Sequence, residues 1–213
     1  MKFKDLFEMA WKRDGDYDFG SAKWNQNGYY ASIEGSNIIF TSKLNGETFY
    51  IEKRKSVFTI SVKKFEDYPT KTDPNGKKER FYIVGTMKTE QTDSYKRIGY
   101  KNTLIVKGVE ILEDYRRYGI GKLLYSGIVK SGYVLVGDSI QYENARNLWI
   151  SLSKHPGFYV DIADLGLTKI IYKNIELTPD DKRIWSYEDS TDKEELKIGR
   201  LRRLILVDVK WKY

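Results

Sequence analysis

The sequence predicts a mixed α+β chain built on a central, mostly antiparallel sheet that is flanked by helices. Two observations lead to this prediction. The first half of the 213 residues is a series of short alternating apolar segments separated by Gly, Asn and Ser, whereas the second half alternates strand-like with helix-like segments. Strands followed by a strand–helix–strand–helix order are typical of a layered mixed sheet. Because no linker divides the sequence, we expect a single domain over residues 1–213.

The composition allows a well-buried core and excludes several kinds of site. The chain contains 17 Tyr, 9 Phe and 5 Trp, enough aromatic area to make global disorder a poor description. It has no Cys, which excludes disulfides and a cysteine nucleophile, and its single His removes most zinc sites. We therefore expect no metal.

The net charge of +7 has two interpretations. A clustered basic surface would attract nucleic acid or a phosphate-rich ligand, but 37 basic residues spread among 30 acidic ones also describe an ordinary lysine-rich surface. No apolar run reaches the roughly 18 residues of a membrane span, and no signal peptide is visible at the start, so we expect a cytoplasmic protein without a membrane partner. The Lys-, Tyr-, Ile- and Asn-rich composition suggests an AT-rich genome, bacterial or viral.

The elements of the first half follow from local patterns. Residues 3–11 place apolar side chains on one helical face, and residues 29–62 read as strands. Asn45-Gly46 suits a tight hairpin turn. The polar segment 67–80 is expected to link two strands of an antiparallel meander. We expect strands of that meander at 57–64, 81–87 and 103–112.

The second half has a different periodicity. Residues 119–130 and 142–154 carry apolar side chains at helical spacing, and in the second segment we expect most of that stripe to be core. Short apolar runs predict strands at 133–136, 157–162, 168–172 and 201–209.

The segment around residues 112–124 carries the chemistry. A strand ends near Leu112, a polar turn follows, and a helix begins beside Gly119 and Gly121. A strand that turns through glycines into a helix presents unpaired N–H groups at the positive helix end, which is an anion site. Basic residues on both sides of the glycines add charge-assisted contacts.

The string from Leu112 to Leu124, LEDYRRYGIGKLL, resembles the acyl-CoA pyrophosphate loop of the GNAT acetyltransferase superfamily. The resemblance covers about residues 57–175, the acyl-CoA-binding core. Residues 1–55 form a strand-rich N-terminal extension that it does not match, and residues 200–211 hold the expected final strand. The string lacks the third glycine of a dinucleotide fingerprint and the Ser or Thr of a P-loop.

The resemblance implies a GNAT-like fold and an N-acetyltransferase that transfers an acetyl group from acetyl-CoA to an amine of a small molecule or protein. It also implies that the pantetheine arm runs along 111–113, that the pyrophosphate lies on the N–H groups of 117–122, and that the acceptor enters where two strands splay apart. The implied cofactor-binding residues are Ile111, Leu112, Glu113, Arg116, Arg117, Tyr118, Gly119, Ile120, Gly121, Lys122 and Asn144.

Three residues are candidates for catalysis. Glu110, on the strand before the loop, is a candidate base, with a solvated carboxylate as the alternative. Asp138, at the end of the next strand, is a second base or a turn cap. Tyr142 is a candidate acid for the leaving thiolate, or an aromatic that packs at a helix start. Many family members place a Tyr acid where this chain has Trp149, whose indole N–H is too weak an acid for that role.

The missing Tyr keeps other functions open. The two alternatives are a non-catalytic binding or structural relative that retains the loop, and a nucleic-acid-directed relative. A homodimer is compatible with the sequence, which does not identify the acceptor amine.

Overall fold

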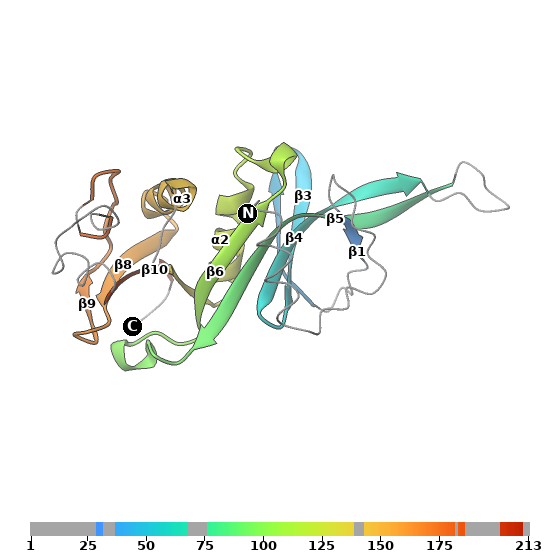
Figure 1. Cartoon of the computed structure of the whole chain (residues 1–213). Helices are drawn as coiled ribbons and strands as arrows, with labels where there is room; N and C mark the ends of the chain where they lie inside the picture. Colours follow the sequence, from blue (N-terminus) through green and yellow to red (C-terminus); the bar gives the residue numbers. More distant parts are fainter. Residues whose placement is uncertain are drawn as a thin grey trace, which may run out of the picture.

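The structure is a computed structural model that describes residues 29–31, 37–67, 76–138, 143–181, 183–185 and 201–210. Within these residues the strands join into one mixed sheet, in the order β2-β3-β4-β5-β6-β7-β10-β8-β9, with β1 (Tyr29–Ala31) paired to β5. Helices α2 (Ile120–Lys130) and α3 (Glu143–Ser153) lie against the sheet (Figure 1). The expected helix over 3–11 lies outside the described residues.

The first half is the expected antiparallel meander. It consists of β2 (Ile38–Leu44), β3 (Glu47–Arg54), β4 (Val57–Asp67), β5 (Lys77–Thr92) and β6 (Thr103–Ile111), each paired to the next. Asn45 and Gly46 connect β2 to β3 with φ of 52° and 84°. Positive φ at both central positions is the geometry of a tight hairpin turn that follows the sheet twist, which confirms the turn expected from Asn-Gly.

Strands β4 and β5 are longer than their apolar centres suggested. The prediction that 67–80 is a polar link is wrong for residues 77–80, which continue β5 and pair with β4 as far as Lys77 opposite Asp67. Lys63 and Glu79 form a cross-strand ion pair of 2.8 Å, so polar residues hold the hairpin where no core faces them. Figure 1 shows this pair of strands extending beyond the rest of the sheet.

The second half adds the parallel contact. From β6 the chain passes through α2 to β7 (Val134–Val136), which pairs parallel with β6. After α3 come β8 (Phe158–Asp164) and β9 (Lys169–Tyr172), and β10 (Arg202–Asp208) inserts antiparallel between β7 and β8. The expected strands and helices of this half are therefore present, with bounds shifted by one or two residues.

Apolar side chains cover both faces of the central strands. Leu135, Leu204 and Leu206 join the large cluster that includes α2 and α3, whereas Val136 and Ile205 point to a second cluster around Tyr95 and Tyr100. This alternation is the period of two expected for a strand buried on both faces. Helix α2 approaches the sheet closely at Gly127, where an added Cβ would lie 2.7 Å from the Phe40 ring.

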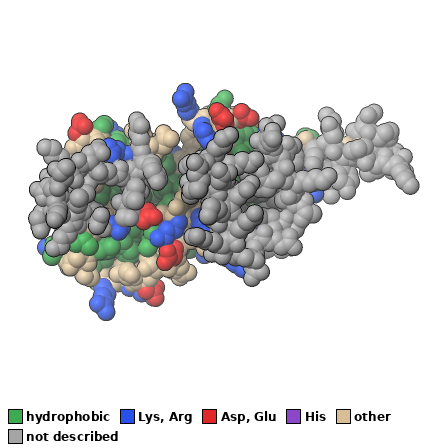
Figure 2. Space-filling model, in the orientation of Figure 1, with side chains coloured by type: hydrophobic (Ala, Val, Ile, Leu, Met, Phe, Trp, Pro, Cys, Tyr) green, Lys and Arg blue, Asp and Glu red, His purple; other side chains and the backbone are tan. Residues whose placement is uncertain are grey.

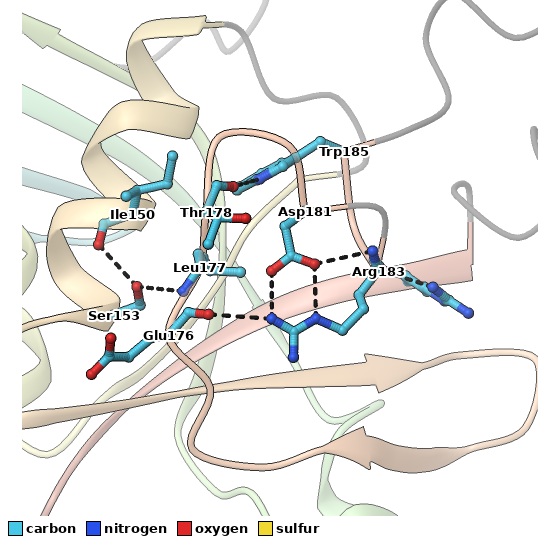
Figure 3. Close-up of polar contacts among 9 residues, drawn as sticks. Ile150, Ser153, Glu176, Leu177, Thr178, Asp181, Arg183 and Trp185 are labelled. Carbon is cyan, nitrogen blue, oxygen red and sulfur yellow. Dashed lines mark hydrogen bonds and ion pairs between the residues drawn. The ribbon is translucent and has the colours of Figure 1, made fainter.

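Segment 174–185 lies against the end of α3 (Figure 3). The Ser153 hydroxyl accepts the Leu177 N–H at 2.9 Å and donates to the Ile150 carbonyl. Asp181 and Arg183 form an ion pair of 2.6 Å, and the Trp185 indole donates to the Thr178 carbonyl at 2.8 Å. These bonds fix a segment whose described residues form no helix or strand. No helix in the described part of the chain is long and apolar enough to cross a bilayer.

Candidate anion and acyl-transfer site

The loop between β6 and α2 bends sharply. Leu112 leads into a short 3-10 turn, η3 (Glu113–Tyr115), and the loop then passes through Arg117 and Gly119, with φ of 67° and 83°. Gly119 is the N-cap of α2, and no side chain caps the helix there. The left-handed conformation at Gly119 is readily adopted only without a Cβ.

The N–H groups at this helix start are free within the described residues. The Leu123 N–H donates to the Gly119 carbonyl, whereas the N–H groups from Arg117 to Lys122, which lie in the turn before α2 and in its first residues, make no backbone or capping hydrogen bond of good geometry in the described part of the chain. Arg117 and Gly119 are exposed, Tyr118 is 58% exposed, and Gly121 and Lys122 are half-buried. Ile120 alone points into the core. The arrangement is an accessible row of donors at the positive end of a helix, which suits an anion.

Strand β7 pairs with only the first part of β6. They pair at Thr103–Val134, Leu104–Leu135 and Ile105–Val136, and β6 then continues to Ile111 without β7. The pairing of β6 with β5 shifts register between Lys88 and Thr89, which adds a residue to β6 at Lys107. Such a bulge bends the strand that carries it. The edge of β6 from Val106 to Ile111 therefore faces the gap left by β7.

The backbone beyond that edge is partly engaged. The Leu112 N–H donates to the Val84 carbonyl at 2.9 Å, and the Ile111 carbonyl accepts Arg116 Nε at 3.1 Å. Arg116 thus folds back against the end of β6 while the residue as a whole stays exposed. Glu113, the next residue of the proposed pantetheine contact, is exposed on η3.

Glu110 lies half-buried on β6 opposite Thr86 of β5. Burial raises the pKa of its carboxyl above the ordinary value of 4.5, and the Arg116 charge opposes that rise. A carboxyl with a raised pKa exchanges protons nearer neutral pH, which suits a general base.

The other candidates lie apart from Glu110 along the chain. Asp138 follows β7. Burial is the main cause that raises the pKa of Tyr95, and the negative charge of Asp138 also raises it. Asn144 is exposed on the first turn of α3. Tyr142 lies outside the described residues.

Trp149 and His155 have packing and turn roles. Trp149 is 1% exposed and meets Tyr125 of α2 edge to face. His155 Nδ1 accepts the Gly157 N–H at 3.0 Å at the start of β8, and burial, followed by Lys122 and Lys130, lowers its pKa.

A pocket of about 330 Å³ adjoins the loop, and the sequence did not predict it. Its walls come from the β2–β3 hairpin, β4, β5, η3 and the start of α2, and the polar and aromatic lining includes Glu47, Lys64, Tyr82, Asp114, Tyr115 and Tyr118. These residues are distant in sequence and share no motif. Only the recurrence of Tyr on either side of the loop hinted at an aromatic surface.

Charges of both signs occur on the face drawn in Figure 2, where the described acidic and basic side chains are intermixed. In the described residues, no group of three or more His, Cys, Asp or Glu is arranged to hold a metal ion.

Comparisons with known proteins give little further information. No family model matches the chain, and no curated protein matches it. A solved structure similar to this chain is the ribosomal-protein-S18-alanine N-acetyltransferase from Escherichia coli, at 15% identity and a TM-score of 0.31. The match covers 76% of this chain and 74% of that one.

Proposed function

We propose that this protein is an acyl-CoA-dependent N-acyltransferase, with acetyl-CoA as donor and an amine as acceptor. One observation carries the proposal: a row of unpaired N–H groups at the start of α2 follows the stretch of β6, Val106 to Ile111, that has no β7 partner. The row suits a diphosphate, and the gap beside β6 suits an extended thioester arm. The GNAT-like string from Leu112 to Leu124 supports the same assignment.

The residues present fit the diphosphate. Gly121 leaves room at the helix start, since the nearest atom to an added Cβ is 3.7 Å away, on Leu148. Arg117 and Lys122 flank the donors with positive charge. In this proposal Ile111, Leu112 and Glu113 border the pantetheine arm, and the Ile111 carbonyl becomes available when Arg116 turns toward the phosphates.

The chemistry asked of the protein is the removal of one proton and the orientation of two reactants. The neutral amine attacks the thioester carbonyl, the C–S bond breaks, and the thiolate leaves and is protonated. We assign the amine proton to Glu110, because its raised pKa and its place on the part of β6 that has no β7 partner suit a base. Asp138 is the alternative base, and Tyr142 the candidate acid for the thiolate.

The test combines binding and turnover. CoA is expected to raise the Tm of the protein by mass action, and Gly119→Glu or Gly121→Glu to abolish the shift, because each places a carboxylate among the phosphate donors. Gly132→Glu is the matched control, since Gly132 has φ of 91° and lies at the other end of α2. An unchanged CoA shift in both loop variants would overturn the site.

A non-catalytic CoA-binding protein is the second candidate, because buried Trp149 occupies the place where many GNAT members have an acidic Tyr. Release of free thiol from acetyl-CoA on addition of amines distinguishes the two. An enzyme releases thiol in proportion to its amount, whereas a binding protein shows the Tm shift without release.

A further inference from the structure

The pocket beside the anion loop has walls suited to a flat ring. Tyr82, Tyr115 and Tyr118 contribute aromatic surface, and the Phe49 ring meets Tyr115 edge to face with centroids 6.5 Å apart. Its volume of about 330 Å³ is at the lower end of the range for small-molecule sites. The pocket therefore suits one small ligand group.

Lys64 gives the pocket a fixed cation. Its Nζ lies 4.5 Å from the Tyr82 ring centroid and 5.0 Å from that of Tyr115. Burial alone lowers the pKa of Lys64, but a side-chain hydrogen bond with Tyr115 and the charges of Tyr82 and Glu47 outweigh it and raise the pKa above 10.5. The ammonium thus stays charged and is held in place by the two rings.

Two carboxylates complete the lining. Glu47 begins β3 and Asp114 lies on η3, both exposed at the pocket. A carboxylate accepts hydrogen bonds, so these groups favour a ligand that presents N–H donors. An exocyclic amino group on a heterocycle is such a donor, and carboxylates read it in this way on nucleic-acid bases.

The position of the pocket indicates which part of a ligand it holds. Tyr118 and Ile120 line it and also belong to the loop with the free N–H groups. Its strands, β3 to β5, lie on the β5 side of β6, whereas the gap lies on the β7 side. A ligand with phosphates on the loop and an arm in the gap directs its other end toward this pocket.

We propose that the pocket binds the nucleoside end of acyl-CoA, with the amino-bearing base among Tyr82, Tyr115 and Tyr118 and its amino group facing Glu47 and Asp114. The Lys64 ammonium is then the hydrogen-bond donor that faces ring nitrogens or the ribose phosphate. This inference rests on the proposed function, and it identifies the residues that select the nucleoside of acyl-CoA.

Calorimetric titration with CoA and with 4′-phosphopantetheine tests the stacking. Tyr118→Ala removes an exposed ring and keeps the backbone N–H, so it is expected to weaken CoA binding roughly tenfold and to weaken phosphopantetheine binding much less. Phe65→Ala is the control, because Phe65 is 68% exposed on β4 and absent from the pocket lining. Equal CoA affinity in Tyr118→Ala and the unaltered protein overturns the inference, whereas failure of the unaltered protein to bind CoA overturns the proposed function.

The base edge is tested with a CoA analogue that carries hypoxanthine in place of adenine. The unaltered protein is expected to prefer CoA roughly tenfold, because the analogue leaves a carboxylate without its donor. The Glu47→Gln/Asp114→Asn double variant should lose most of that preference. Because both ligands carry the same phosphates, their ratio is insensitive to the removal of two charges. The assignment of the carboxylates is overturned if the unaltered protein does not prefer CoA to the analogue. It is also overturned if the double variant keeps the full preference.

Discussion

The Trp149 indole on α3 meets the Tyr125 ring on α2 edge to face, with centroids 5.8 Å apart and an interplanar angle of 82°. Both side chains are almost fully buried, and burial raises the pKa of the Tyr125 hydroxyl far above its usual range. The pair fixes the two helices that follow β6 and β7. Trp149 is therefore a core residue.

Trp149→Ala should destabilise the protein by about 3–5 kcal/mol, since it removes a large buried ring and leaves a cavity. Trp149→Phe should cost less. Unfolding by denaturant measures the loss of stability in both variants. We expect Trp149→Phe to keep the Tm shift with CoA, and a variant with near-normal stability but no CoA response would show that the indole contacts the ligand.

Two glycines of α2 should respond in opposite ways to alanine. At Gly127 the added methyl meets Ile51 and Phe40, so Gly127→Ala should lose about 1–3 kcal/mol of stability through overpacking. At Gly121 it meets only Leu148 at an ordinary distance, so Gly121→Ala should retain or slightly raise the stability. In titrations with CoA, Gly121→Ala should bind CoA more weakly than the unaltered protein, although its stability is retained. Gly127→Ala should show no such loss of CoA affinity. Equal stabilities for the two variants would contradict the close approach of α2 to the sheet.

Glu110→Gln tests the raised pKa of Glu110. A carboxyl whose folded pKa is above its unfolded value contributes most stability below that unfolded value, and the contribution is lost as the pH rises through the folded pKa. Relative to the unaltered protein, Glu110→Gln should therefore be more stable at neutral pH, with a difference that disappears below about pH 4.5. Chemical denaturation across pH 4–8, an interval set by these pKa values, measures it. If Glu110 is the base, acyl transfer by the variant should also lose its rise with pH.

Asp181→Asn should show the reverse dependence. The hydrogen bond with Arg183, ahead of backbone hydrogen bonds and the Arg183 charge, lowers the pKa of Asp181 below 3.8, although burial opposes it. Stability from this carboxylate is present above the unfolded pKa and is lost as the pH falls through the folded value. We expect a loss of about 1 kcal/mol at neutral pH, a modest figure because Arg183 is partly exposed. Asp180→Asn, at an exposed residue, is the control. Similar losses of stability in both variants would show that the Asp181 carboxylate does not stabilise segment 174–185.

Local patterns in the sequence predicted much of the fold. Asn45-Gly46 predicted the hairpin because the turn needs positive φ, and the stripe of Trp149 and Leu152 predicted a buried helix face. The length of β5 was underestimated because residues 77–80 are polar and are held by cross-strand pairs. The order β7-β10-β8 could not be read from local signals, since it depends on which edges remain unpaired.

The site was predictable only where the chain makes it from one segment. The free N–H groups at Gly119 and Gly121 follow from a strand, a turn and a helix that are consecutive. The pocket joins Glu47, Lys64 and Tyr115 through sheet register, so no spacing in the sequence connects them.

The position of β10 has a consequence for synthesis on the ribosome. Strand β10, residues 202–208, pairs with β7 on one side and with β8 on the other. The β8–β9 hairpin is therefore joined to the rest of the sheet through a strand that is translated after β7, β8 and β9. Until that strand emerges, the nascent chain holds two sheet fragments with open, apolar edges, which are sites for mispairing. The sheet is thus completed only after β10 has been translated, and stop codons shortly before residue 202 should yield chains that aggregate rather than shortened folded proteins.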